Sequence, residues 1–182
     1  MTLSKLSILL GVVVALANLY VFMNPKAVKE LAPRFPRNIP LGYALMGLAT
    51  LWFLYNLNLE QTADFLAYKR PMMIGFGAVG VMTCIYVTDF LPVRGLAILL
   101  MLLAKFMLDT ARWADTQWRL VFSVWAYVMI LAGMWWTISP WRVRDIINWA
   151  VADEQRLKMW AGIKSGFGVL LIILGVTAFR GA

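Results

Sequence analysis

The sequence predicts an all-helical, polytopic integral membrane protein that crosses the bilayer six times. Hydrophobic residues make up 62% of the 182 positions and charged residues only 14%, a balance outside the range of ordinary soluble domains. The apolar residues gather in runs close to the roughly 20 residues that a helix needs to cross about 30 Å of hydrocarbon. Prolines and most charges fall between these runs. Together these observations predict a single transmembrane helical bundle that comprises residues 1–182.

Six apolar runs are predicted to span the membrane, with short connections between them. The first has Asn18 as its strongly polar member, and Lys5 before it resembles the start of a secretory signal. The apolar run continues beyond Ala17, which favours a retained helix over a cleaved one. Prolines mark several joints, as expected where helices start or stop. The predicted spans are residues 6–23, 41–57, 72–88, 91–111, 118–138 and 160–179.

The basic residues indicate how these spans are oriented. With six spans, the odd-numbered connections share one side of the membrane, and both termini share the other side with the even-numbered connections. The positive-inside rule therefore places the odd-numbered connections in the cytoplasm and both termini outside, in the cell (inner) membrane. The odd connections carry Lys26, Lys29, Arg34, Arg37, Arg94, Arg142, Arg144, Arg156 and Lys158, and the other side carries Lys5, Lys69, Arg70, Arg112, Arg119 and Arg180.

Composition argues against several kinds of chemistry. The sequence has no histidine, which removes the commonest protein ligand of haem and zinc, and Cys84 has no second cysteine for an internal disulfide. It also has no glycine-rich phosphate loop and no carboxylate pair with a base in reach. We therefore expect no enzymatic activity, no catalytic residues, no metal site and no cofactor, although a bound phospholipid is compatible with this composition.

The net charge of +8 is spread over the short connections. It lacks the interleaved aromatic residues of a nucleic-acid-binding stripe, so we expect no nucleic-acid partner. The expected partners are the lipid bilayer, whose headgroup phosphates attract lysine and arginine, and other membrane subunits.

A candidate polar cluster lies near the end of the fourth predicted span. Lys105, Asp109 and Arg112 follow one another at about one helical turn, and Lys105 lies about 9 Å from the end of the span at 1.5 Å per residue. One interpretation is a stripe of interfacial charges that neutralise one another. The other is a working site for a proton or an ion, which usually has an acid or base near the midplane. No carboxylate occupies the centre of a predicted span, which favours the structural interpretation.

A variant of the second interpretation turns this cluster toward the bundle interior. There Lys105 and Asp109 would meet Asn56, Asn58 or Arg119 from neighbouring helix ends. Such a polar pocket could take a lipid headgroup or a quinone ring beside Trp52, Trp113 and Trp118.

The last predicted span carries a face of small residues. Gly162, Gly166 and Gly168 have the kind of spacing that lets two helices approach closely. The face has two interpretations, which are close packing within the bundle and packing against another subunit.

The segment 141–157 is predicted to form an amphipathic helix in the interface plane, because its apolar residues recur at helical spacing. Trp141, Ile146, Ile147 and Trp149 are its candidate docking residues. The alternative is a helix that lies at the headgroup level without binding a partner.

By elimination, the sequence favours a non-catalytic accessory or scaffolding subunit of a larger membrane protein complex. Two alternatives stay open. One is a small transporter or channel that acts as an oligomer, with Lys105 and Asp109 as its polar site; a weak internal repeat between the basic connections after the first and fifth spans is compatible with it. The other is a lipid- or quinone-binding membrane protein.

Overall fold

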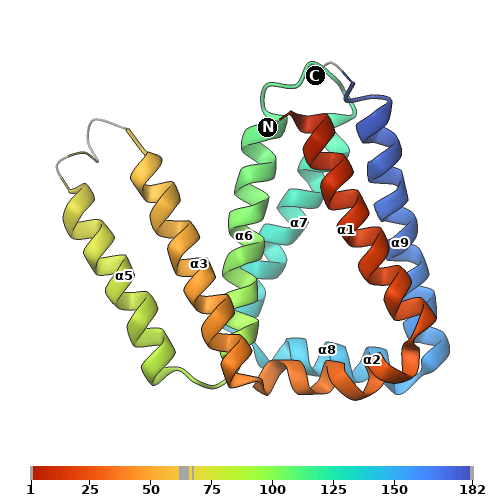
Figure 1. Ribbon diagram of the computed structural model, residues 1–182, viewed down its shortest axis with the longest axis horizontal. Coiled ribbons are helices and arrows are strands. Elements are labelled where there is room, and N and C mark those ends of the chain that lie inside the picture. The colour runs from red at the N-terminus through yellow and green to blue at the C-terminus, as the bar shows by residue number, and fades with distance from the viewer. Residues whose placement is uncertain (1, 62–65, 67, 181–182) are drawn as a thin grey trace. The chain divides into compact units, whose positions relative to one another are not determined.

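The computed structural model describes residues 2–61, 66 and 68–180, and every regular element within them is a helix. The all-helical prediction is thus confirmed for this part of the chain. In chain order the elements are α1 (Leu3–Met23), α2 (Pro25–Leu31), the 3-10 helix η1 (Ala32–Arg37), α3 (Ile39–Leu59), α5 (Lys69–Tyr86), α6 (Leu91–Ala111), α7 (Arg119–Ile138), α8 (Trp141–Ala152) and α9 (Glu154–Val176) (Figure 1).

Five of these helices, α1, α3, α6, α7 and α9, are long and apolar enough to cross a membrane. They correspond to five of the six predicted spans, and they are consistent with a multi-pass membrane protein. The remaining predicted span, 72–88, corresponds to α5, which is not among the five. Its 18 residues extend about 27 Å and begin with Lys69 and Arg70, so its apolar part is shorter than the others.

The predicted amphipathic segment 141–157 is not one continuous helix. The helix α8 ends at Ala152, and Asp153 has an extended backbone and accepts a hydrogen bond on Oδ1 from the backbone nitrogen of Gln155 at 3.0 Å. This is an N-cap, so a new helix starts at Glu154. The last predicted span, 160–179, therefore begins earlier than expected and ends at Val176.

The structure also contains α2 and η1 in the connection between the first two predicted spans. Pro25 occupies the first position of α2, where the missing N–H of proline costs no intrahelical hydrogen bond. The proline therefore starts a helix here as well as ending the previous one.

The described residues form two compact units. The first contains the residues up to 33 together with 103–129 and those from 144 onward, and the second contains 34–102 and 130–143. Because each unit is defined by its own contacts, the single bundle inferred from the sequence stays a prediction.

In the first unit, α1 and α9 pack antiparallel with their backbones in contact (Figure 1). A Cβ atom on Gly11 would lie 2.7 Å from the carbonyl oxygen of Gly168, and one on Gly168 would lie 2.6 Å from the backbone nitrogen of Ala15. Real Cβ atoms do not approach other atoms so closely. Only glycine therefore fits at these two positions, as at other close helix crossings in membranes.

Two serine hydroxyls bridge the same helix pair. Ser7 Oγ is buried and donates a hydrogen bond to the carbonyl oxygen of Leu171 at 2.7 Å. Ser4 Oγ donates to the carbonyl oxygen of Gly175, also at 2.7 Å. Such interhelical bonds contribute on the order of 1 kcal/mol each in a membrane, and they fix the register in which α1 and α9 meet.

Aromatic side chains join α7 to this pair. Phe122 is fully buried and meets Phe179 edge to face with ring centroids 6.4 Å apart, and Trp125 meets Phe167 in the same way at 5.3 Å. Edge-to-face pairs add to the stabilisation from burial because the positive ring edge faces the negative ring face.

The second unit uses the same small-residue packing. A Cβ on Gly95 of α6 would lie 2.8 Å from the backbone nitrogen of Met46 on α3, and one on Gly133 of α7 would lie 2.9 Å from a carbonyl oxygen of α6. Phe53 and Phe76, with ring centroids 4.9 Å apart, hold α5 against α3. Close backbone approach and aromatic pairs therefore stabilise both units.

Replacement of Gly168 by leucine tests the α1/α9 packing. The new side chain has no space, so α1 and α9 must separate, and we expect the free energy of unfolding to fall by about 2 kcal/mol or more. Denaturation of the protein in mild detergent by increasing amounts of a harsh detergent measures this loss.

Gly166→Leu is the matched control, because a Cβ at Gly166 would have no heavy atom within 4 Å. We expect it to change the free energy of unfolding by less than about 1 kcal/mol. Equal losses in the two variants would contradict the assigned packing.

Candidate interfacial binding site

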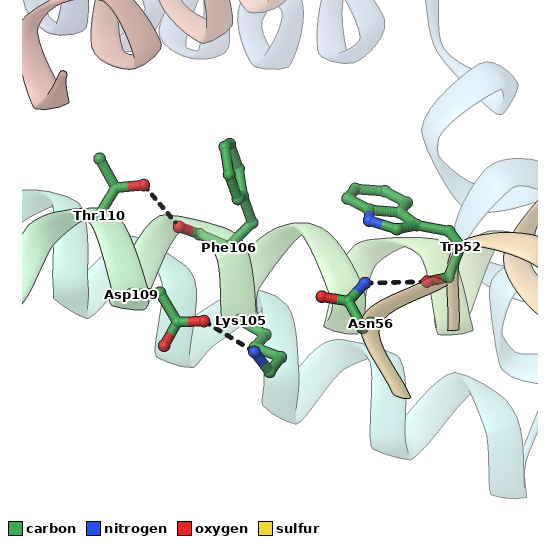
Figure 2. Close-up of polar contacts among 6 residues, drawn as sticks. All are labelled: Trp52, Asn56, Lys105, Phe106, Asp109 and Thr110. Carbon is green, nitrogen blue, oxygen red and sulfur yellow. Dashed lines mark hydrogen bonds and ion pairs between the residues drawn. The ribbon is translucent and has the colours of Figure 1, made fainter. Parts of the chain in front are cut away.

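Within the predicted polar cluster, Lys105 and Asp109 of α6 form an ion pair with each other. Lys105 Nζ lies 2.7 Å from Asp109 Oδ2, and the two side chains are 55% and 51% exposed (Figure 2). Arg112 is also exposed, and its carbonyl oxygen accepts a hydrogen bond from the guanidinium of Arg119. An open hollow of about 410 Å³ beside Asp109 includes Trp113, one of the aromatic residues considered above. The geometry of Lys105 and Asp109 is that of an ordinary pair one turn apart on a helix surface.

Two other polar side chains donate hydrogen bonds within their own helices. Asn56 Nδ2 donates to the carbonyl oxygen of Trp52 at 2.9 Å, and Thr110 Oγ1 donates to the carbonyl oxygen of Phe106 at 2.8 Å (Figure 2). Asn56 belongs to the second unit and Asp109 to the first. Their predicted meeting in one pocket therefore stays a prediction.

The three glycines predicted as a packing face have different surroundings. Gly168 lies against α1, whereas a Cβ at Gly162 or Gly166 would have no heavy atom within 4 Å. The glycine pattern thus includes one internal packing position and two positions on an exposed surface of α9.

Three of the four predicted docking residues lie in the wall of a pocket. Ile146, Ile147 and Trp149 of α8 line a pocket of about 360 Å³ in the first unit, which we call the interfacial pocket. Trp141, the fourth predicted residue, is exposed and does not line it. Its lining includes residues of α2, α8 and one end of the α1/α9 pair. Figure 1 shows α2 and α8 near that end of the pair.

The other walls of the interfacial pocket come from α1, α2, α9 and the first residue of η1, Ala32. The end of α1 supplies Asn18, and α2 supplies Val28. The first half of α9 supplies Leu157, Trp160 and Lys164. The lining is therefore mostly apolar, with one amide and one ammonium group among the aliphatic and indole side chains.

Arg156 and Trp149 connect α8 to α9 across the break at Asp153. The guanidinium carbon of Arg156 lies 4.5 Å from the centroid of the Trp149 ring, and Nη1 donates to the carbonyl oxygen of Trp149 at 3.0 Å. Trp149 also meets Trp160 edge to face at 6.5 Å. A carbonyl oxygen near the end of α8, which lacks an intrahelical partner, is thereby satisfied, and the wall of the pocket is held in place.

The charges around the interfacial pocket are predominantly positive. Lys158 Nζ lies 2.8 Å from Glu154 Oε1, so this lysine has a partner. Lys26 joins these two residues in lining a second hollow of about 440 Å³. In contrast, Lys164 takes part in none of the ion pairs found between residues 2 and 180 where the structure is described.

No protein-family profile, curated protein or solved structure matches this chain. The interfacial pocket is therefore interpreted from its own residues. The helical spacing of α8 was sufficient to find Ile146, Ile147 and Trp149 in the sequence. It gave no indication that Asn18 and Val28, more than a hundred positions away, complete the same pocket.

Proposed function

We propose that this protein is a non-catalytic accessory or scaffolding subunit of a larger membrane protein complex. The observation that carries the proposal is that polar side chains in the helices donate hydrogen bonds to backbone carbonyl oxygens of the same helix. A solute pathway needs polar side chains that face a shared route, and in the described helices the side-chain amides and hydroxyls repeatedly bond their own helix instead. The residues that donate to the carbonyl oxygen four positions earlier are Asn18, Asn24, Thr50, Asn56, Thr83, Thr110, Thr137 and Thr177.

The polar pair that a transporter would use is also poorly suited to transport. Lys105 and Asp109 bond each other, and both are about half exposed. A pair that neutralises itself on a helix surface near the headgroups needs no other role. This favours the accessory subunit over the transporter or channel.

Two surfaces are available to a partner subunit. On α8, Trp141 and Ile146 are exposed, and on α9 the glycines Gly162 and Gly166 leave a shallow surface. A partner helix can approach closely at small residues, whereas large exposed apolar residues supply contact area. We propose that α8 lies in the interface plane and that these surfaces contact the rest of the complex.

The proposal includes six crossings, with α5 as the additional one. Its charged start is accommodated at a membrane surface, since the ammonium group of Lys69 donates to the carbonyl oxygens of Asn58 and Glu60 beyond the apolar part of α3. The remaining apolar residues of α5 are nearly long enough to cross, and slight thinning of the bilayer covers the difference. The basic α2 and α8 segments then lie in the cytoplasm, with both termini outside the cell.

The number of crossings can be tested by the sidedness of the two ends. In a Cys84→Ala background, cysteine at Thr2 is expected to react with a membrane-impermeant maleimide in intact cells, and alkaline phosphatase fused after residue 180 is expected to be active. Cysteine at Arg34, in the first connection, should react only after the cells are opened. Five crossings would place the two ends on opposite sides and contradict the proposal.

The subunit proposal is tested by purification of the tagged protein in mild detergent and mass spectrometry of the intact assembly. We expect a stoichiometric second membrane protein. Trp141→Ser should reduce its recovery at least severalfold, because Trp141 is exposed on the proposed contact surface and does not line the interfacial pocket. Leu131→Ser, at an exposed position of α7, is the matched control. A lone monomer or a homo-oligomer would contradict the proposal.

A further inference from the structure

We propose that the interfacial pocket binds one anionic phospholipid, with an acyl chain against its apolar wall and the phosphate at Lys164. This site is distinct from the Lys105/Asp109 cluster, and the inference does not depend on the identity of any partner subunit. It rests on three features of the pocket. These are its shape and lining, an ammonium group that takes part in no ion pair among the described residues, and the excess of positive charge around it.

The shape and lining of the pocket suit a ligand with an acyl chain. The volume of about 360 Å³ falls within the usual range for small-molecule pockets. Val21, Val28, Ile147, Val151 and Leu157 come from α1, α2, α8 and α9 and form a largely aliphatic wall. A free phosphate or a small sugar would leave this wall in contact with water, whereas an acyl chain would cover it.

The lysine at this site needs an anion. Lys164 lies about 15 Å along α9 from its first residue, inside a helix long and apolar enough to cross a membrane. The ion pairs found in the described segments do not include it. An ammonium group at membrane depth is costly unless it is neutralised or reaches the headgroup layer, and a lipid phosphate at the pocket mouth satisfies both conditions.

The surrounding charge selects an anionic lipid over a zwitterionic one. Arg156 lies over Trp149, a pocket residue, and Lys26 lines the adjacent hollow with the Lys158/Glu154 pair. Lys26, Arg156, Lys158 and Lys164 thus outnumber Asp153 and Glu154, the two acids at the break between α8 and α9. Lysine and arginine beside tryptophan rings are typical of the headgroup level of a membrane protein, and clustered cations there attract anionic lipids.

The experiment is native mass spectrometry of the full-length protein released from detergent, with phosphatidylglycerol and phosphatidylcholine of identical acyl chains added in turn. We expect one tightly held phosphatidylglycerol per chain and at least tenfold weaker retention of phosphatidylcholine. Inorganic phosphate at millimolar concentration should not displace the lipid. Equal retention of the two lipids, or displacement by phosphate, would overturn the proposal.

Two variants locate the bound lipid. Lys164→Gln should lower phosphatidylglycerol retention about tenfold, since it removes a charge-assisted contact to phosphate. Lys164→Arg should retain the lipid to within about threefold. Lys105→Gln is the matched control, because Lys105 is also a lysine within a long apolar helix but lies outside the pocket. Equal effects of Lys164→Gln and Lys105→Gln would contradict the assignment.

A second pair tests the acyl wall and does not depend on the folding of the Lys164 variants. Ala150→Leu fills the pocket, whereas Ala152→Leu adds the same side chain to an exposed residue of α8 outside it. We expect the first to lower lipid retention at least fivefold and the second to leave it unchanged. Unchanged retention in Ala150→Leu would exclude the pocket as the binding site.

Discussion

The backbone contact between α1 and α9 is the constraint on which the rest of the first unit depends. Gly11 and Gly168 allow the two helices to touch, and the Ser7 hydroxyl bonded to the carbonyl oxygen of Leu171 sets their register. Lipid tails are as apolar as leucine, so in hydrocarbon such packing and hydrogen bonding replace the hydrophobic effect as the forces between helices. The contact also determines which residues of α1 and α9 lie together at the end of the pair, and hence the walls of the interfacial pocket.

Sequence was a good guide to features that depend on short stretches of chain. The span 91–111 coincides with α6, because a long apolar run beside a proline defines a helix locally. It was a poor guide to caps and to long-range partners. The predicted helix over 141–157 divides at Asp153, whose side chain caps α9. The sequence did not indicate this cap, because an aspartate within an amphipathic pattern can equally well lie on the solvated face of a continuous helix. Nor did the sequence indicate that Lys164 lines a pocket, since that pocket is assembled from α1, α2, η1, α8 and α9.

The function of the polar residues in this protein depends on what each of them bonds. Composition shows that amides, hydroxyls and charges are present within apolar runs, but it does not show what they bond. In the structure, Asn56 and Thr110 bond their own helices, and Lys105 bonds Asp109. These bonds lie within single helices, which supports a passive role for α3 and α6. Lys164 differs from Lys105 in having no such partner among the described ion pairs, and this difference distinguishes the proposed lipid site from the structural pair.

The central claim, that α1 and α9 meet antiparallel at backbone distance in one register, is tested most directly by disulfide formation. In a Cys84→Ala background, cysteines at Ala15 and Ser165 occupy positions where the Ser165 hydroxyl now lies 3.4 Å from the carbonyl oxygen of Ala15. We predict rapid oxidation of this pair within one chain in native membranes, and little oxidation when the first cysteine is moved to Leu16, which is exposed on another side of α1. Equal oxidation of the two pairs, or none in either, would contradict the packing from which the pocket and its proposed ligand follow.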